Sequence, residues 1–179
     1  RVDLSGILKL AASEEIAALQ GDGSVALQSS TLTVSGGSAS VFSGAISGSG
    51  ALSKSGSGVM TLSGFNTFAG GVNLSGGALQ VANNSALGSG TIAFTGGRLS
   101  SDSSSFRTIT NPLAFAGTVT IGDLISNGGL TLTGSGALAA NTIMNVMSRA
   151  TMSGVLSGSY DFVKTGASEL TLGAVNTFT

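Results

Sequence analysis

Residues 41–69 read VFSGAISGSGALSKSGSGVMTLSGFNTFA, and residues 151–179 read TMSGVLSGSYDFVKTGASELTLGAVNTFT. Laid over each other without a gap, from Val41 on Thr151 to Ala69 on Thr179, the two blocks are identical at 12 positions. Three further pairs keep their apolar character: Ile46 over Leu156, Leu52 over Phe162 and Met60 over Leu170. A repeated block of short apolar runs and glycine turns indicates a repeat architecture. Repeat architectures of this kind build extended scaffolds and binding surfaces.

The composition of the 179-residue chain is poor in charge and rich in small residues. Charged residues make up 8%, hydrophobic residues 41%, and the mean hydropathy is +0.44. No run of about 18 apolar residues is present, so the sequence contains no transmembrane segment. The regularly spaced Ile, Val, Leu and Phe can bury a core, which argues against intrinsic disorder. The composition therefore favours a β-rich protein covered by Ser, Thr, Asn and Gly.

Several function classes are excluded by residue types that are missing. The net charge is −1 and there is no basic run, so the chain lacks the positive footprint of a nucleic-acid binder. It has no Cys, which removes disulfides and thiolate metal sites. It has no His, the commonest general base and metal ligand. We therefore expect no cofactor, no metal site and no nucleic-acid partner.

From Gly23 onward, apolar and polar residues alternate with a period of two. This pattern places the first and third side chains of each run on one face and the middle one on the other. The clearest runs are 25–27, 32–34, 60–62, 72–74, 79–81, 119–121 and 130–132. Glycine pairs such as Gly36-Gly37 and Gly76-Gly77 separate the runs and suit turns. We expect strands of about three to five residues, shorter than typical.

Short strands with frequent turns fit either an antiparallel sandwich or barrel, or a right-handed parallel β-helix. The β-helix is favoured because hairpin signals are nearly absent, with Asn127-Gly128 the one candidate. A sandwich usually buries one or more Trp, but here Trp is missing and aromatic residues are few, which also favours the β-helix. The predicted fold class is therefore all-β, a right-handed parallel β-helix (β-solenoid) with glycine-rich turns. With coils of about 20 to 25 residues, the offset between the two blocks spans about five coils.

The sequence divides into two parts. Residues 1–22 are expected to form an irregular or capping first coil, in which Ser13–Leu19 is either a short capped helix or a loop. Residues 23–179 are expected to form β-helix coils, with a polar loop at Ser100–Ser105. The chain begins with Arg1 and stops inside the second repeat block, so we expect a piece of a longer chain.

The segment from Leu52 to Gly71, LSKSGSGVMTLSGFNTFAGG, resembles the passenger-associated transport repeat, the autotransporter-associated β-strand repeat of type V secreted proteins. The resemblance continues through residues 76–81 and 86–90 and returns at 162–178. The second copy departs from the pattern at Ser168 and at Gly173-Ala174. Residues 21–44 resemble the usual lead-in, so the likeness covers over half of the chain.

The resemblance implies a passenger built as a right-handed β-helix and exported through a C-terminal outer-membrane barrel that this sequence does not contain. It predicts a location at the cell surface or outside a Gram-negative bacterium. It also implies that the repeat helps the passenger to cross the outer membrane and to fold at the surface. From the low charge and the polar surface of Ser, Thr and Asn we infer a structural stalk with adhesion or self-association, and we expect no enzyme activity. The expected partners are neighbouring coils of the full-length chain, another copy, or a host or surface ligand.

Seven of the positions that are identical in the two repeat blocks are predicted to be structural. They are Lys54, Gly56, Thr61, Leu62, Asn66, Thr67, Phe68, Lys164, Gly166, Thr171, Leu172, Asn176, Thr177 and Phe178. The two lysines form either a basic surface row or, as we favour, solvated charges at a strand edge that blunt sheet pairing. The two asparagines either bond turn backbone groups or stack in a ladder.

The alternative function is a carbohydrate-active β-helix, glycosidase-like or lyase-like, that uses an acid pair. Coils of about 22 residues place Asp102 and Asp123 on neighbouring coils, with Arg98 or Arg107 close by. Two carboxylates within about 10 Å in a groove lined by aromatic residues would support this function. The chain has no Trp and one Tyr, so the aromatic platform of such enzymes is scarce.

Overall fold

The alternating runs coincide with β-strands in the computed structural model, which describes residues 1–179. Both apolar residues of each of the seven runs are buried, while the middle residue is more exposed in every case. The predicted period of two is therefore confirmed. It arises because successive side chains of a strand point to opposite sides of the sheet.

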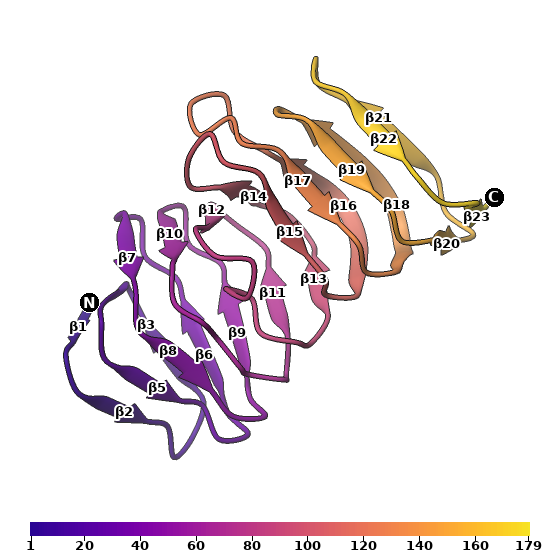
Figure 1. Ribbon diagram of the computed structural model, residues 1–179. Helices are drawn as coiled ribbons and strands as arrows, with labels where there is room; N and C mark the ends of the chain where they lie inside the picture. The colour runs from indigo at the N-terminus through magenta and orange to yellow at the C-terminus, as the bar shows by residue number, and fades with distance from the viewer.

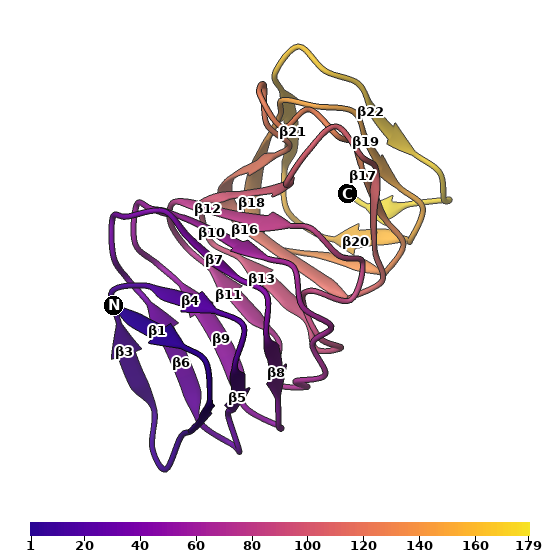
Figure 2. The ribbon, with the colours of Figure 1, turned by 60° about the vertical axis from the view of Figure 1, so that its left-hand side comes forward.

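The strands stack in parallel, each on its equivalent one coil further along the chain, and build nine coils. Figure 1 shows the coils following one another from the N-terminus at one end to the C-terminus at the other. The prediction of a parallel β-solenoid is confirmed. Each coil has three strand positions, which we call faces 1, 2 and 3; Figure 2 shows the chain turning through them.

Face 1 runs through all nine coils without interruption. Its strands are β1 (Val2–Leu4), β4 (Leu19–Gly21), β7 (Ser40–Phe42), β10 (Val59–Leu62), β12 (Ala78–Val81), β14 (Arg98–Ser101), the second halves of β16 (Leu113–Ile121) and β18 (Gly136–Val146), and β21 (Phe162–Thr165).

Face 3 is also continuous. Its strands are β3 (Glu14–Ile16), β6 (Thr31–Val34), β9 (Ala51–Lys54), β11 (Val72–Leu74), β13 (Ile92–Phe94), the first halves of β16 and β18, β20 (Leu156–Gly158) and β23 (Thr177–Phe178).

Face 2 is interrupted in the middle of the solenoid. Coils 1 to 3 carry β2 (Ile7–Lys9), β5 (Ser24–Ala26) and β8 (Ala45–Ser47), and coils 6 to 9 carry β15 (Arg107–Ile109), β17 (Leu130–Leu132), β19 (Ala150–Met152) and β22 (Leu170–Leu172). In coils 4 and 5, residues 63–71 and 82–91 cross this face without forming strands.

Two strands are longer than the sequence predicts. β16 has 9 residues and β18 has 11, because each turns the corner from face 3 to face 1 without leaving the β conformation. Their pairing shifts register between Phe115 and Gly117, where Gly117 has a φ of 73°. A bulge with glycine at positive φ lets a strand bend while its pairing continues.

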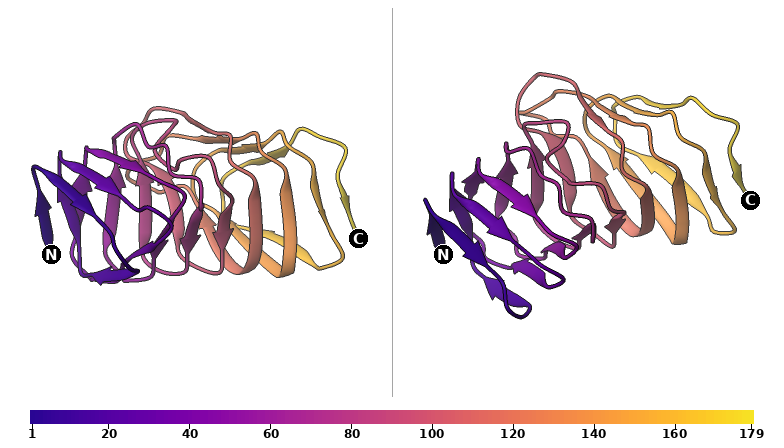
Figure 3. Two further views of the ribbon diagram at one scale, coloured as in Figure 1. Left: turned by 90° about the horizontal axis from the view of Figure 1, so that it is seen from below. Right: turned by 60° about the horizontal axis from the view of Figure 1, so that its bottom comes forward.

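The coils differ in length along the chain. Val2 pairs with Leu19 in the first coil, whereas Gly117 pairs with Thr142, so the coil that starts at Gly117 is longer. This coil contains the loop at 122–129, and the coil before it contains the loop at 102–106. Both loops stand out from one side of the stack in Figure 3. The polar loop predicted at Ser100–Ser105 therefore starts later, because Ser100 and Ser101 are buried in β14.

Residues 1–22 form regular strands and contain no helix, so the helical alternative for Ser13–Leu19 is wrong. Glu14–Ile16 is strand β3, whose residues pair with Leu32, Thr33 and Val34 of β6. Pairing with the next coil therefore overrides the local helical signals of the two glutamates.

The core is a stack of apolar side chains along the solenoid axis. Its clearest row on face 3 contains Phe94 over Phe115, whose rings stack with centroids 5.0 Å apart. Glycines let neighbouring coils approach at the corners. A Cβ on Gly44 would collide with the carbonyl oxygen of Gly23, and one on Gly154 would collide with that of Gly134. These two glycines occupy the same place in the two repeat blocks.

Candidate functional site: the repeat segments and a groove on face 1

The two repeat blocks lie on different faces of the solenoid. Lys54 belongs to β9 on face 3, and Lys164 belongs to β21 on face 1. From β9, five coils lead along face 3 to β20, and the next strand is β21. The offset between the two blocks therefore equals five coils and one further strand position. For this reason the two lysines cannot form a single basic row.

Asn66 holds three coils together where face 2 has no strand. Its Oδ1 accepts the N–H of Ile46 at 2.7 Å, and its Nδ2 donates to the carbonyl of Ala86 at 2.6 Å. The side chain is buried, with 3% of the residue exposed. It thus bonds backbone groups of the preceding and the following coil, which would otherwise be buried without partners.

Asn176 repeats half of this arrangement in the last coil. Its Oδ1 accepts the N–H of Leu156 at 2.8 Å, which is the contact of Asn66 with Ile46 at the equivalent positions of the second block. Its Nδ2 donates to Ala174 of its own coil at 3.1 Å. Both asparagines therefore bond backbone groups, as one of the two predicted alternatives states, although Ile46 and Leu156 lie in strands β8 and β20 and not in turns.

Other asparagines of this region act in the same way, and the sequence analysis did not identify them. Asn111 donates to the carbonyls of Leu87, Gly88 and Gly90 in the preceding coil. Asn84 accepts the N–H of Thr108 in β15 at 3.0 Å. Together with Asn66 they carry the stacking of face 2 from β8 to β15. The signal available in the sequence was the concentration of Asn where the alternation stops.

Lys54 is an interior residue, so the prediction that it is a solvated charge at a strand edge is wrong. It lies between Val34 and Leu74 in an inward-facing row of face 3, and 1% of the residue is exposed. Its Nζ donates a short hydrogen bond to the carbonyl of Gly56. Burial lowers the pKa of Lys54 from its ordinary value of 10.5.

Lys164 makes the same local contact in a different environment. Its Nζ donates to the carbonyl of Gly166 at 2.7 Å, and the residue pairs with the buried Met144. It too stands in an inward-facing row, but it is exposed in the last coil. The shared sequence therefore specifies the contact of the lysine with its own turn, whereas the following coil decides whether the lysine is buried.

The remaining repeat residues lie in the core or on the flanks. Leu62 and Phe68 are fully buried, while Leu172 is 37% exposed and Phe178 packs against Phe162 with ring centroids 5.8 Å apart. The hydroxyl of Thr61 donates to Oε1 of Gln80 in the next coil at 3.1 Å. The others occupy turns or outward positions: Gly56, Thr67, Gly166, Thr171 and Thr177.

Asp102 and Asp123 do lie on neighbouring coils, as predicted, since β14 pairs with the second half of β16. Each is engaged by an arginine: Asp102 by Arg107 at 2.9 Å and Asp123 by Arg98 at 2.7 Å. Asp123 also accepts the N–H groups of Ile125 and Ser126 and so caps the 122–129 loop. The arrangement is that of two structural ion pairs, and no acid lines the neighbouring groove.

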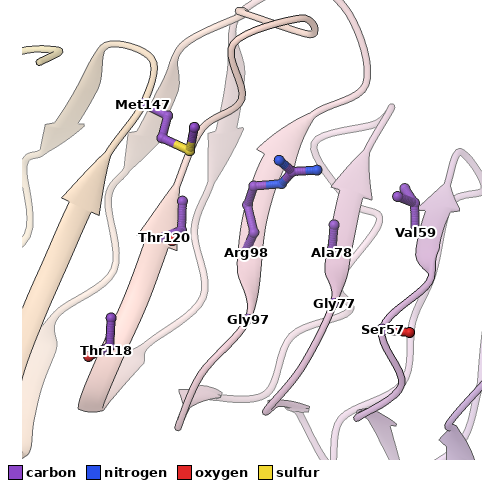
Figure 4. A pocket seen from close by; sticks show the side chains of 9 residues that line it. All are labelled: Ser57, Val59, Gly77, Ala78, Gly97, Arg98, Thr118, Thr120 and Met147. Carbon is purple, nitrogen blue, oxygen red and sulfur yellow. The ribbon is translucent and has the colours of Figure 1, made fainter. Parts of the chain in front are cut away.

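That groove lies on the outer side of face 1 and has a volume of about 440 Å³. Figure 4 shows its lining along neighbouring strands, with Arg98 in the middle. The lining residues are Ser57, Val59, Gly77, Ala78, Gly97, Arg98, Thr118, Thr120 and Met147. Small residues make the floor in coils 5 and 6, and this is why the surface is hollow there.

No group of three or more His, Cys, Asp or Glu side chains converges as a metal site would require. The structure has no helix of sufficient length and apolarity to cross a membrane.

All four arginines form ion pairs with carboxylates: Arg1 with Asp3, Arg98 with Asp123, Arg107 with Asp102 and Arg149 with Glu169.

Comparison with known proteins gives one match. The family model of the passenger-associated-transport-repeat matches residues 52–81 and 162–179. Neither the curated proteins nor the solved structures contain a significant match to this chain. The first matched segment runs from β9 to β12 and includes Lys54 and Asn66, and the second runs from β21 to β23 and includes their counterparts. Two segments of this nine-coil β-solenoid are therefore similar to the passenger-associated-transport-repeat.

Proposed function

We propose that this chain is a surface-exposed or secreted passenger segment of a Gram-negative autotransporter, and that it serves as a stalk whose repeats aid translocation and folding. The observation that carries the proposal is the presence of two transport repeats on one solenoid. Stalk and translocation roles suit a fold in which each coil contacts only its neighbours.

The pairing of the strands supports a role in export. Every strand pairs only with its equivalents in adjoining coils, from Val2 with Leu19 in the first coil to Gly158 with Phe178 in the last. A chain that emerges from a narrow pore can therefore add one coil at a time onto the coil already formed. Each added coil buries its apolar row against the last, and this contribution to stability favours movement in one direction.

The repeats contribute where strand pairing is missing. Asn66 connects coils 3, 4 and 5 across the part of face 2 that has no strands. Without such bonds the backbone groups of Ile46 and Ala86 would be buried unpaired, at about 1–3 kcal/mol each. We infer that the repeat lets stacking continue through this irregular part of the solenoid.

The test is a secretion assay with the chain fused to a signal peptide and an autotransporter barrel. Asn66→Ala and Asn176→Ala are compared with Val119→Ala, a core variant outside the matched segments, after their free energies of unfolding have been measured in vitro. We expect the repeat variants to reduce surface-exposed, protease-resistant protein more than their stability loss explains. If the amount of protein at the surface depends only on the free energy of unfolding, equally for the asparagine variants and for Val119→Ala, the translocation role is contradicted.

Self-association is a second function that a specific surface favours. Ile143 and Val163 are paired neighbours on the outer side of face 1, with exposures of 44% and 48%. All arginines are neutralised by carboxylates, so little charge opposes the approach of a second copy. Sedimentation velocity over a concentration series should show association that Val163→Lys weakens and Thr131→Lys does not. A strict monomer at every concentration would exclude this function.

A further inference from the structure

A row of four residues, one from each of four adjacent coils, runs along the groove on face 1. Val59, Ala78, Arg98 and Thr120 are in register on β10, β12, β14 and β16. Three strand spacings of about 4.8 Å give the row a length of about 14 Å. The hollow has a volume of about 440 Å³ and is open to solvent. The hollow is therefore long enough for a short chain molecule rather than a single small ion.

The polar groups of the groove are hydrogen-bonding groups without net charge. Ser57, Thr118 and Thr120 supply hydroxyls, each able to donate and to accept. Their hydroxyls have no side-chain partner in the structure, in contrast to that of Thr61 on the same face. The groove thus offers free donors and acceptors along one side.

Arg98 is held in place by Asp123 and remains partly exposed to the groove. Its Nη1 lies 2.7 Å from Oδ2 of Asp123, whose side chain is 8% exposed and which also accepts two loop amides. The Nε of Arg98 is buried without any partner, and the side chain as a whole is 29% exposed. Figure 4 shows the guanidinium lying over the strands between Thr120 and Ala78. Since Asp123 compensates its charge, Arg98 offers directed N–H groups more than a positive field.

Two other ligand classes fit this site less well. An added peptide strand needs free backbone groups, but β12 and β14 are paired on both sides. An anion needs an uncompensated cation, and the only cation in the lining is ion-paired. Val59 and Met147 add apolar contacts at the two ends of the hollow.

The geometry points to a binding site for a neutral, polyhydroxylated chain, that is, a short uncharged oligosaccharide. Its hydroxyls can form hydrogen bonds with Arg98, Thr118 and Thr120, and its C–H faces can pack against Val59 and Met147. No aromatic residue lines the groove, so binding is weak, with a dissociation constant on the order of 1 mM. This site is independent of the role of the repeats in export.

The experiment is a titration of the ¹⁵N-labelled full chain, followed by amide chemical shifts. The probes are maltotriose, cellotriose, mannotriose and chitotriose, with trigalacturonate as the anionic comparison. We expect at least one neutral trisaccharide to shift amides at 77–78, 97–98, 118–120 and 147. Thr118→Val and Thr120→Val each weaken the binding, and the double variant weakens it tenfold or more. Valine keeps the shape and the strand propensity, and circular dichroism confirms that the variants fold.

Thr131→Val is the matched control, because it removes an outward hydroxyl from β17 on face 2. It should leave the shifts unchanged. The proposal is overturned if no neutral trisaccharide shifts the groove amides, if trigalacturonate binds more tightly than all four, or if the double valine variant binds like the wild type. None of these outcomes bears on the secretion assay.

Discussion

The side chain of Asn66 accepts the backbone N–H of Ile46 at 2.7 Å, across the boundary between two coils. The same contact joins Asn176 to Leu156, although that pair lies one strand position further round the solenoid. The local bonding of the repeat is thus independent of the face on which the repeat lies. It depends on the turn that follows the strand, because that turn directs the asparagine into the stack.

Asn66→Ala should lower the free energy of unfolding by about 2–5 kcal/mol, because two buried backbone groups lose their partners, at about 1–3 kcal/mol each. Denaturant unfolding followed by circular dichroism measures the change. Asn73→Ala is the control, since Asn73 is exposed on β11, and it should stay within about 0.5 kcal/mol of the wild type. Equal losses in both variants would show that Asn66 is not a bridge.

Lys54→Met should stabilise the protein at neutral pH by about 1–3 kcal/mol, because it removes a buried ammonium that no carboxylate compensates. Burial holds the pKa of Lys54 below 10.5, so the unfolded chain binds more protons between the folded-state pKa and that value. The stability of the wild type should therefore rise with pH across this window.

The methionine variant should lack this alkaline rise, which urea titrations at a series of pH values would measure. Lys164→Met serves as the control, since Lys164 is exposed and makes the same contact with its own turn. It should change stability little at any pH. A Lys54→Met variant less stable than the wild type would mean that the bond to Gly56 outweighs the burial of charge.

Gly44→Ala and Gly154→Ala should each lower the melting temperature. In both, the new methyl group collides with a carbonyl oxygen of the preceding coil, and overpacking of this kind costs about 1–3 kcal/mol. Gly6→Ala is the matched control, because a Cβ there meets nothing within 4 Å. Calorimetry should place this control close to the wild type, and a similar loss in all three would show that the collision with the preceding coil is not the cause.

Asp123→Ala should loosen the 122–129 loop and leave the solenoid folded. The amides of Ile125 and Ser126 lose their acceptor, and Arg98 loses its counterion. Hydrogen bonds to charged groups contribute about 1.5–3 kcal/mol, so amide exchange at these two residues should accelerate about tenfold or more. Asp161→Ala removes an exposed carboxylate and should leave both rates unchanged. Unchanged exchange in Asp123→Ala would contradict the capping role.

The sequence was a good guide wherever a strand contains its own pattern. Val72–Leu74 and Leu130–Leu132 alternate as a half-buried strand must, and their apolar residues are buried as predicted. The placement of Asp102 and Asp123 on neighbouring coils could also be predicted, because the two residues are about one coil length of 22 residues apart. The strand at Glu14–Ile16 could not be predicted, since its conformation comes from pairing with β6 and not from its own residues.

The environment of single side chains was harder to predict. The sequence alone predicts that Lys54 is a surface charge. Its position in the strand directs the side chain inward, and the neighbouring coils bury it. The groove on face 1 depends on Ala78 and Gly97 being small beside Val59 and Thr120. Residues of successive coils come together only once the register of the coils is known.

The offset of five coils and one strand position has a consequence for valency. Two repeats separated by a whole number of coils would present one motif along a single line, and a flat partner could hold both at once. Here the copies point in different directions around the axis, because Lys54 and Lys164 lie on faces 3 and 1. A rigid flat surface can engage one copy only, whereas two partners on different sides of the rod would each meet the same sequence.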